Sequence, residues 1–169
     1  MKSKKDAGIT LIEMLVTAIV IAIVGAVAVP NVLGVINRNL VKQGIAQVEG
    51  AIKEAQRQAI RMGKQCQMNI DTVNKRIRAQ TVEATPIECL LSTRELNDNL
   101  DLATNDADII FGSKGNPDND IESIYVVHMP NGTTEQRCFV VSPGLGIMRT
   151  GEYDGDPAIL DVNNCVALP

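Results

Sequence analysis

The stretch Gly8-Ile9-Thr10-Leu11-Ile12-Glu13 opens an apolar run that extends to Val29 and is followed by Pro30. Glu13 is the one charged residue in that run. A carboxylate at the centre of a lipid-spanning helix costs about 2.5 to 3.5 kcal/mol, and less toward the helix ends, so Glu13 requires a partner. Cleavage after Gly8 would create one, because the new amine of Ile9 could meet Glu13 of a neighbouring subunit in a packed assembly.

The length of the apolar run suits a membrane. Residues 9–29 form a helix long enough, at about 1.5 Å per residue, to span a hydrocarbon core of ~30 Å. Lys2, Lys4 and Lys5 precede it and favour a cytoplasmic N-terminus, with the rest of the chain outside. The sequence therefore predicts a transmembrane helix over residues 9–29.

Two simpler interpretations of this segment are a secretory signal peptide and an ordinary single-pass anchor. A signal peptide has a basic start, an apolar region and a small-residue cleavage site. Here the apolar run is long and contains Glu13, and Val29-Pro30-Asn31 lacks such a site, although Ala26-Val27-Ala28 could mimic one. An ordinary anchor leaves Glu13 unexplained.

Residues 30–63 continue the helix with a different character. Pro30 removes a backbone donor, so a kink or local unwinding is expected there. Beyond it, apolar residues recur at spacings of three and four, which places them on one helical face: Val41, Ile45, Val48, Ile52, Ala55, Ala59 and Met62. We expect one long helix from about Ile9 to Arg61, ended by Gly63.

The remaining residues, 64–169, predict a β-rich head. The expected strands alternate with turn-rich segments: residues 66–70, 76–82, 109–111, 123–129, 137–142 and 147–150, with the first two joined as a hairpin through residues 71–74. An antiparallel sheet packed on the helix would bury the apolar helical face. The fold class is therefore α+β, with a membrane-spanning first half of the helix and an amphipathic second half.

Four cysteines, Cys66, Cys89, Cys138 and Cys165, lie in this head. They form no C-x-x-C pair and have no histidine at zinc-ligand spacing, so we expect no zinc site. In an oxidising compartment their even number predicts two disulfides, for which three connectivities are possible. We favour Cys66 with Cys89 and Cys138 with Cys165; buried free thiols are the alternative.

Sequence motifs for catalysis are lacking. His128 is the single histidine, and the sequence has no Walker loop and no Gly-x-Gly-x-x-Gly. We expect no enzyme activity and no cofactor. Asp118, Asp120 and Glu122, with Asn119 between them, are weak candidates for calcium ligands, since they lack the spacing of an EF-hand loop and a solvated loop is the ordinary interpretation.

The basic leader ending in Gly8, the Ile9 to Glu13 sequence, the apolar helix and Pro30 resemble the class III signal of type IV pilins and type II secretion pseudopilins. This resemblance implies cleavage by prepilin peptidase between Gly8 and Ile9, N-methylation of Ile9, and an assembly role for Glu13. Ile9 departs from the usual Phe of the family. Glu54 to Gly63 and Cys138 to Gly146 are similar to segments of the GspH/FimT group.

The resemblance implies a pilin-like fold and a minor pilin or pseudopilin that assembles with other such subunits. It further implies contact with an inner-membrane assembly platform, and transfer from the bacterial inner membrane to a filament in the periplasm or at the cell surface. A DNA-binding minor pilin for DNA uptake is the alternative function, with Arg149, and with Lys75, Arg76 and Arg78, on phosphates. Gly146-Ile147-Met148-Arg149 keeps only the last arginine of the Gly-Arg-x-Arg motif used there. Residues 82–169 hold fifteen acidic residues against four basic ones, which argues against nucleic acid. A membrane-anchored enzyme is a third, weaker hypothesis.

Overall fold

The computed structural model describes residues 9–80, 89–130 and 135–167 of the 169-residue chain, with side chains for all of these except residues 27–31. The chain divides into two compact units, Met1–Ile36 and Asn37–Pro169. The predicted leader, residues 1–8 with Gly8, lies outside the described residues.

Helix α1, Leu11–Met62, is a single helix of 52 residues and closely matches the predicted one. It is continuous through Pro30, so the local unwinding expected there does not occur. It ends where predicted: Gly63 adopts a left-handed φ of 62°, and the Lys64 amide donates to the Ala59 carbonyl. Within the part of the chain that the structure describes, no helix is both long enough and apolar enough to cross a membrane.

The second unit contains two antiparallel sheets rather than the single sheet expected from the sequence. The first has the order β3-β2-β1-β5. Its strands are β1 (Cys66–Asp71), β2 (Arg76–Gln80), β3 (Arg94–Glu95) and β5 (Asp108–Phe111). Strands β1 and β2 form the predicted hairpin, in register from Gln67↔Gln80 to Asp71↔Arg76. Residues 81 and 82, the predicted end of the second strand, lie outside the described residues.

The second sheet has the order β4-β6-β7-β8-β9. Its strands are β4 (Asp101–Thr104), β6 (Ser123–His128), β7 (Arg137–Val141), β8 (Met148–Tyr153) and β9 (Cys165–Ala167), and the short 3-10 helix η1 (Val162–Asn164) precedes β9. The chain passes from the second sheet to the first between β4 and β5. There the Asp106 carboxylate accepts hydrogen bonds from the Ser123 hydroxyl, at 2.9 Å, and from the Asn119 amide. This partly buried network therefore lies at the point where the chain crosses from one sheet to the other.

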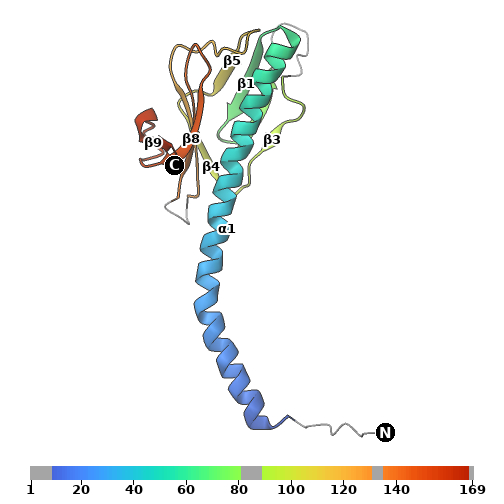
Figure 1. Ribbon diagram of the computed structural model, residues 1–169, viewed down its shortest axis with the longest axis vertical. Helices are drawn as coiled ribbons and strands as arrows, with labels where there is room; N and C mark the ends of the chain where they lie inside the picture. The colour runs from blue at the N-terminus through green and yellow to red at the C-terminus, as the bar shows by residue number, and fades with distance from the viewer. Residues whose placement is uncertain (1–8, 81–88, 131–134, 168–169) are drawn as a thin grey trace, which may run out of the picture. The chain divides into compact units, whose positions relative to one another are not determined.

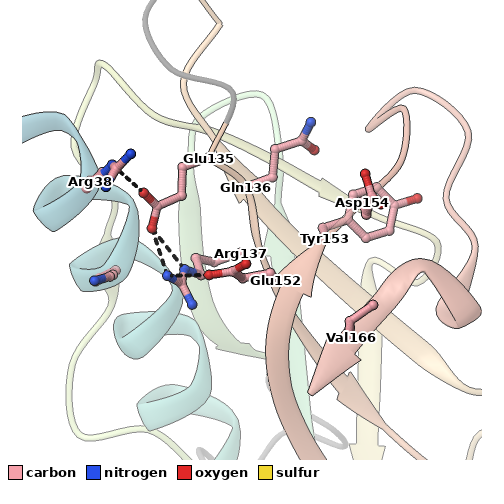
Figure 2. Close-up of a pocket in the computed structure, with 9 residues that line it drawn as sticks. Arg38, Glu135, Gln136, Arg137, Glu152, Tyr153, Asp154 and Val166 are labelled. Atoms are coloured by element: carbon pink, nitrogen blue, oxygen red, sulfur yellow. Dashed lines mark hydrogen bonds and ion pairs between the residues drawn. The ribbon is translucent and has the colours of Figure 1, made fainter. Parts of the chain in front are cut away.

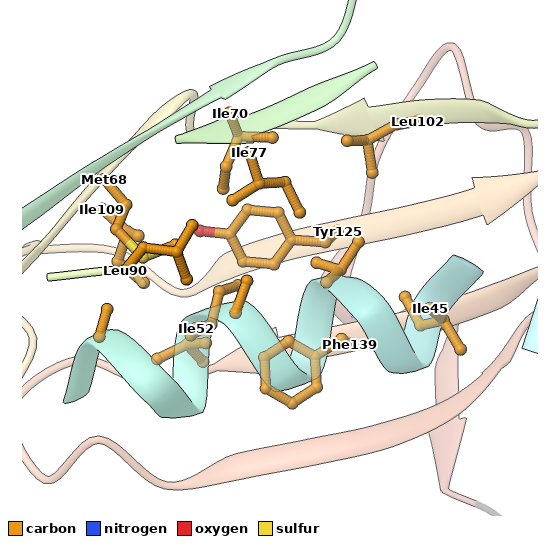
Figure 3. Close-up of a cluster of buried hydrophobic side chains, with 14 of the residues drawn as sticks. Ile45, Ile52, Met68, Ile70, Ile77, Leu90, Leu102, Ile109, Tyr125 and Phe139 are labelled. Carbon is orange, nitrogen blue, oxygen red and sulfur yellow. The ribbon is translucent and has the colours of Figure 1, made fainter. Parts of the chain in front are cut away.

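The second half of α1 lies along both sheets (Figure 1), and the predicted apolar face of the helix faces the main core. Ile52 lies in that core with Met68 and Ile109 from the first sheet, and with Phe139 from the second (Figure 3). The helix thus joins two sheets that share few strand contacts of their own. The prediction of a single sheet was wrong, because the apolar face of the helix packs against two sheets.

Tyr125 supplies the largest buried side chain of this core. Its hydroxyl points toward Met68, Leu90 and Ile109 (Figure 3). Burial, followed by the nearby Asp106 charge, raises the pKa of the Tyr125 hydroxyl far above its usual value. Tyr125 therefore stays neutral and acts as a packing residue.

A second, smaller core covers the outer face of the five-stranded sheet. Ile124, Val126 and Val140 lie there beneath the C-terminal segment, which contributes Tyr153 together with partly buried Leu160 and Val162. The Cys138–Cys165 disulfide lies within this cluster. The last 15 or so described residues thus cover the outer face of the five-stranded sheet, and the Cys138–Cys165 disulfide holds them there.

Candidate functional site

The start of α1 is the first candidate site, because it carries Ile9 and Glu13. Thr10 caps the helix: its hydroxyl oxygen accepts from the Glu13 amide at 3.3 Å, and its carbonyl accepts from the Met14 amide at 3.2 Å. Glu13 therefore lies in the first turn, where the helix dipole favours a carboxylate. Ile9 precedes the first helical residue, Leu11, by two residues.

The part of α1 that lies in the first unit, residues 11–36, carries large apolar side chains on all sides, and these side chains are exposed in the single chain. Leu11 is 83% exposed and Ile21 is 71% exposed. The exposed set in this unit comprises Ile9, Leu11, Ile12, Met14, Leu15, Val16, Ile19, Val20, Ile21, Ile23, Val24, Val32, Leu33, Val35 and Ile36. Glu13 has no ion-pair partner among the described residues. A surface of this kind requires lipid or other helices around it.

A cluster of four charged groups ties the start of the second unit's helical segment to the five-stranded sheet (Figure 2). Glu135 accepts from Arg38 Nε at 3.1 Å and from Arg137 Nη2 at 2.7 Å, and Glu152 lies 3.0 Å from the same Arg137 atom. The Arg137 side chain is only 8% exposed. Sequence reasoning missed this cluster, since the alternation Glu135-x-Arg137 is its only local signal.

The cluster lines one side of an open cleft of about 590 Å³. Lys42 from α1 and Tyr153 and Asp154 from the end of β8 line it as well. The charges of both signs offset one another, so the cleft offers no single-sign surface to a ligand. Its groups instead fix the position of α1 relative to β7 and β8.

Two further glutamates of α1 connect the helix to the sheets. Glu49 accepts from the Thr150 hydroxyl of β8 at 3.1 Å, and Glu54 accepts from the Leu91 amide at 3.0 Å and from Arg94 at 3.1 Å. Gly44 allows the helix to approach the second sheet closely, because a Cβ there would lie 2.7 Å from Leu100 Cδ1. These contacts hold the second-unit segment of α1 against both sheets.

Both disulfides have the favoured pairing. Cys66 is joined to Cys89, with Cα atoms 5.4 Å apart, and Cys138 to Cys165, with Cα atoms 5.8 Å apart. Cys66 begins β1 directly after α1, so the first bond fixes the segment that follows the helix. All four sulfur atoms are committed to structure.

The residues suggested for DNA are divided between the two sheets and engaged in contacts within the chain. On β8, Arg149 donates to the Val162 carbonyl at 2.9 Å. On the other sheet, Arg76 pairs with Glu95 at 3.0 Å, and Arg78 donates to Asn69 at 3.3 Å. Lys75 lies 3.1 Å from Asp101 and donates to the Asp98 carbonyl. Arg149 thus lies on a different sheet from Arg76 and Arg78, and all four side chains already have partners within the chain.

The weak calcium candidates are not brought together either. Among the described residues, no group of three or more His, Cys, Asp or Glu side chains is placed to hold a metal ion. Glu122 instead accepts from the Ser142 hydroxyl at 2.7 Å, and Asn119 is used by Asp106. Asp118, Asp120 and Glu122 are neighbours in sequence, but they do not converge on a common point. The structure therefore gives the calcium hypothesis no support, and calcium binding at this loop stays a prediction.

Comparison of the sequence with known families and proteins gives one match, at the N-terminus. Residues 3–29 match the family described as the prokaryotic N-terminal methylation motif. No curated protein is significantly similar in sequence to the chain.

Solved structures resemble the fold at low identity. A crystal structure of the type IV minor pilin FimU of Pseudomonas aeruginosa has a TM-score of 0.56 at 13% identity, covering 66% of this chain and 88% of that one. A second crystal form of FimU has a TM-score of 0.54 at 10% identity, covering 70% and 94%. The minor pseudopilin EpsH from the type 2 secretion system of Vibrio cholerae has a TM-score of 0.46 at 13% identity, covering 64% and 94%.

Proposed function

We propose that this chain, which carries the N-terminal methylation motif and the fold of the type IV pilin and pseudopilin superfamily, is a minor structural subunit of a type IV pilus or a type II secretion pseudopilus. The observation that carries the proposal is the combination of the motif with a helix whose first unit is apolar on all sides. The function is assembly through that helix, without catalysis.

Processing after Gly8 gives the helix its assembly chemistry. The new amine of Ile9 would lie two residues before Leu11, where α1 begins. A positive charge at that end of a helix is unfavourable, because the helix dipole is also positive there. The Glu13 carboxylate of a neighbouring subunit would offset both charges. Cleavage and assembly are thus coupled by one ion pair.

The same segment would hold the subunit in the inner membrane before assembly. The proposed membrane helix is residues 9–29, with the N-terminus cytoplasmic and residues 64–169 outside. Prepilin peptidase would cut at Gly8 and methylate Ile9, and the assembly platform would extract the subunit. Apolar surface would then pass from lipid to the helices of other subunits, while Glu13 gains a partner.

DNA uptake is not part of the proposal. Arg149, Lys75, Arg76 and Arg78 all contact groups within the chain, and they lie on two different sheets. Phosphate binding would have to break these contacts, and it would gain no clustered positive charge in return.

Replacement of Glu13 by Gln tests the proposal, because it keeps the size of the side chain and removes its charge. Incorporation of the variant into purified filaments should fall about tenfold, equal to a loss of ~1.4 kcal/mol, while membrane insertion stays unchanged. Thr17→Ala is the matched control, since the Thr17 hydroxyl bonds only the Met14 carbonyl one turn earlier. Normal incorporation of Glu13→Gln would refute the role of the charge.

A further inference from the structure

A shallow groove of about 470 Å³ runs along β4, the edge strand of the five-stranded sheet. Residues 102–105 of β4 and its end line it, together with Thr72 from the β1–β2 turn and with Pro157, Ala158 and Leu160 from the C-terminal segment. An edge strand presents backbone amides and carbonyls without a partner strand. The groove therefore offers a template for another extended chain.

The two faces of β4 extend into apolar surroundings. Leu102 is buried in the main core, whereas Ala103 packs against the second core beside Leu160. Two large apolar side chains flank the groove in sequence: Val73, 85% exposed, follows Thr72, and Ile159, 74% exposed, follows Ala158. An added strand would place its alternate side chains on the same two faces.

Aspartates predominate among the residues that border the groove in sequence. Every residue that lines it is neutral, but each lining segment is bordered by an aspartate: Asp71, Asp101, Asp156 and Asp161. Asp101 pairs with Lys75 at 3.1 Å, and the other three have no ion pair in the part of the chain that the structure describes. Hydrogen bonds from Asn74 hold the pKa of Asp71 below its usual value, so this carboxylate is charged at neutral pH. A cationic occupant fits this rim.

We propose that the β4 groove binds an extended segment of a partner polypeptide as an added strand, with apolar residues alternating along it and Lys or Arg at its ends. The backbone edge selects the extended form, Val73 and Ile159 select apolar side chains, and the aspartates select the positive ends. This function is separate from assembly through α1.

A second copy of this chain does not supply such a segment from its described residues. Its cations between Arg38 and Arg61 lie in α1, which is helical. Those at residues 75–78 lie at the start of β2, which is already paired with β1 and β3. Arg94, Arg137 and Arg149 lie in strands that are also paired, and the two other described cations lie directly after α1 and in the turn after β5: Lys64 and Lys114. The proposed occupant is therefore a different polypeptide.

A synthetic peptide tests the proposal with the full chain purified in nonionic detergent. The probe is a fluorescein-labelled peptide of about eight residues, within the usual range of strand lengths, with alternating valine and threonine and a lysine at each end. The comparison peptide has glutamate at both ends. Binding is measured by fluorescence anisotropy, and amide hydrogen exchange is followed at residues 101–105.

The lysine peptide should bind and slow exchange at residues 101–105. Ile159→Asp should weaken binding about tenfold, the effect of losing one apolar contact and adding a charge. Leu145→Asp, an equally exposed position on the β7–β8 turn, is the matched control and should change binding by less than about twofold. The proposal is overturned if the lysine peptide does not bind, if the glutamate peptide binds as tightly, if exchange at residues 101–105 is unchanged, or if both variants behave alike.

Discussion

Removal of Glu135 should destabilise the head far more than removal of an exposed partner. Arg137 is 8% exposed, and its two carboxylate partners differ: Glu135 is 15% exposed, whereas Glu152 is 57% exposed. Loss of one partner from a buried ion pair costs about 3 to 5 kcal/mol. Glu152 remains in Glu135→Ala and water can enter from the open cleft, so we expect a loss of about 2 kcal/mol in the free energy of unfolding.

The matched control is Glu95→Ala, which removes the Arg76–Glu95 pair. Both of those side chains are more than half exposed, so the loss should be below about 0.5 kcal/mol. Thermal unfolding of the full chain in detergent, followed by circular dichroism, should show Tm lowered by about 8 °C for Glu135→Ala and by about 2 °C or less for the control.

A double variant separates charge from packing. Glu135→Ala combined with Arg137→Leu should recover part of the lost stability, because it removes a buried charge whose only remaining described ion-pair partner is the exposed Glu152. Equal Tm values for Glu135→Ala and Glu95→Ala would refute the reasoning.

Three further perturbations follow from particular contacts. Gly44→Val should lower the free energy of unfolding by about 1 to 3 kcal/mol in urea unfolding, because a Cβ at residue 44 would lie 2.7 Å from Leu100 Cδ1. Gly50→Ala should raise it by about 0.5 to 1 kcal/mol, because a Cβ at residue 50 would meet open space and alanine favours the helix. If the two glycines respond alike, close helix packing is not the cause. The double variant Cys138→Ser with Cys165→Ser should lower the free energy of unfolding by about 3 kcal/mol, because it removes a disulfide. Proteases should then cleave residues 154–167 faster than in the unreduced parent chain, and added reductant should have little further effect on the cleavage rate. An unchanged cleavage rate in the variant would show that the disulfide does not hold this segment in place. Asp71→Asn should lower Tm at pH 7 but not at strongly acidic pH. The pKa of Asp71 is lower in the folded chain than in the unfolded chain, so its carboxylate stabilises the fold above the unfolded-state pKa, and this stabilisation is lost as the pH falls through the folded-state pKa. The same Tm difference at both pH values would exclude this cause.

The sequence predicted the elements whose signals are local. The spacing of apolar residues from Val41 to Met62 placed one face of α1 in the core, and Gly63 marked its end. The β1–β2 hairpin also followed from a local pattern, with Asp71 accepting from the Val73 and Asn74 amides in the turn.

Elements that depend on distant partners could not be predicted in this way. Strands β3, β4 and β9 have two to four residues each and exist because a neighbouring strand pairs with them. At the crossover between the two sheets, Asp106 accepts from Ser123, 17 residues away in sequence. The Arg38–Glu135 contact likewise joins groups almost a hundred residues apart.

The candidate site shows the same limit. Glu13 and Ile9 could be proposed from the sequence because they lie in one contiguous stretch, and residues 3–29 match the family described as the prokaryotic N-terminal methylation motif. The calcium candidates are close in sequence, but their carboxylates do not converge in the described structure, and Glu122 accepts from Ser142 instead. The β4 groove had no sequence signal, since it combines a turn, a strand edge and the C-terminal segment.

Mass spectrometry of the mature chain, purified from membranes or filaments, tests the central claim most directly. The account predicts a chain that begins at N-methylated Ile9 and contains both disulfides. A chain that keeps Met1, or one cut after Ala28 as a secretory signal peptide would be, would contradict it.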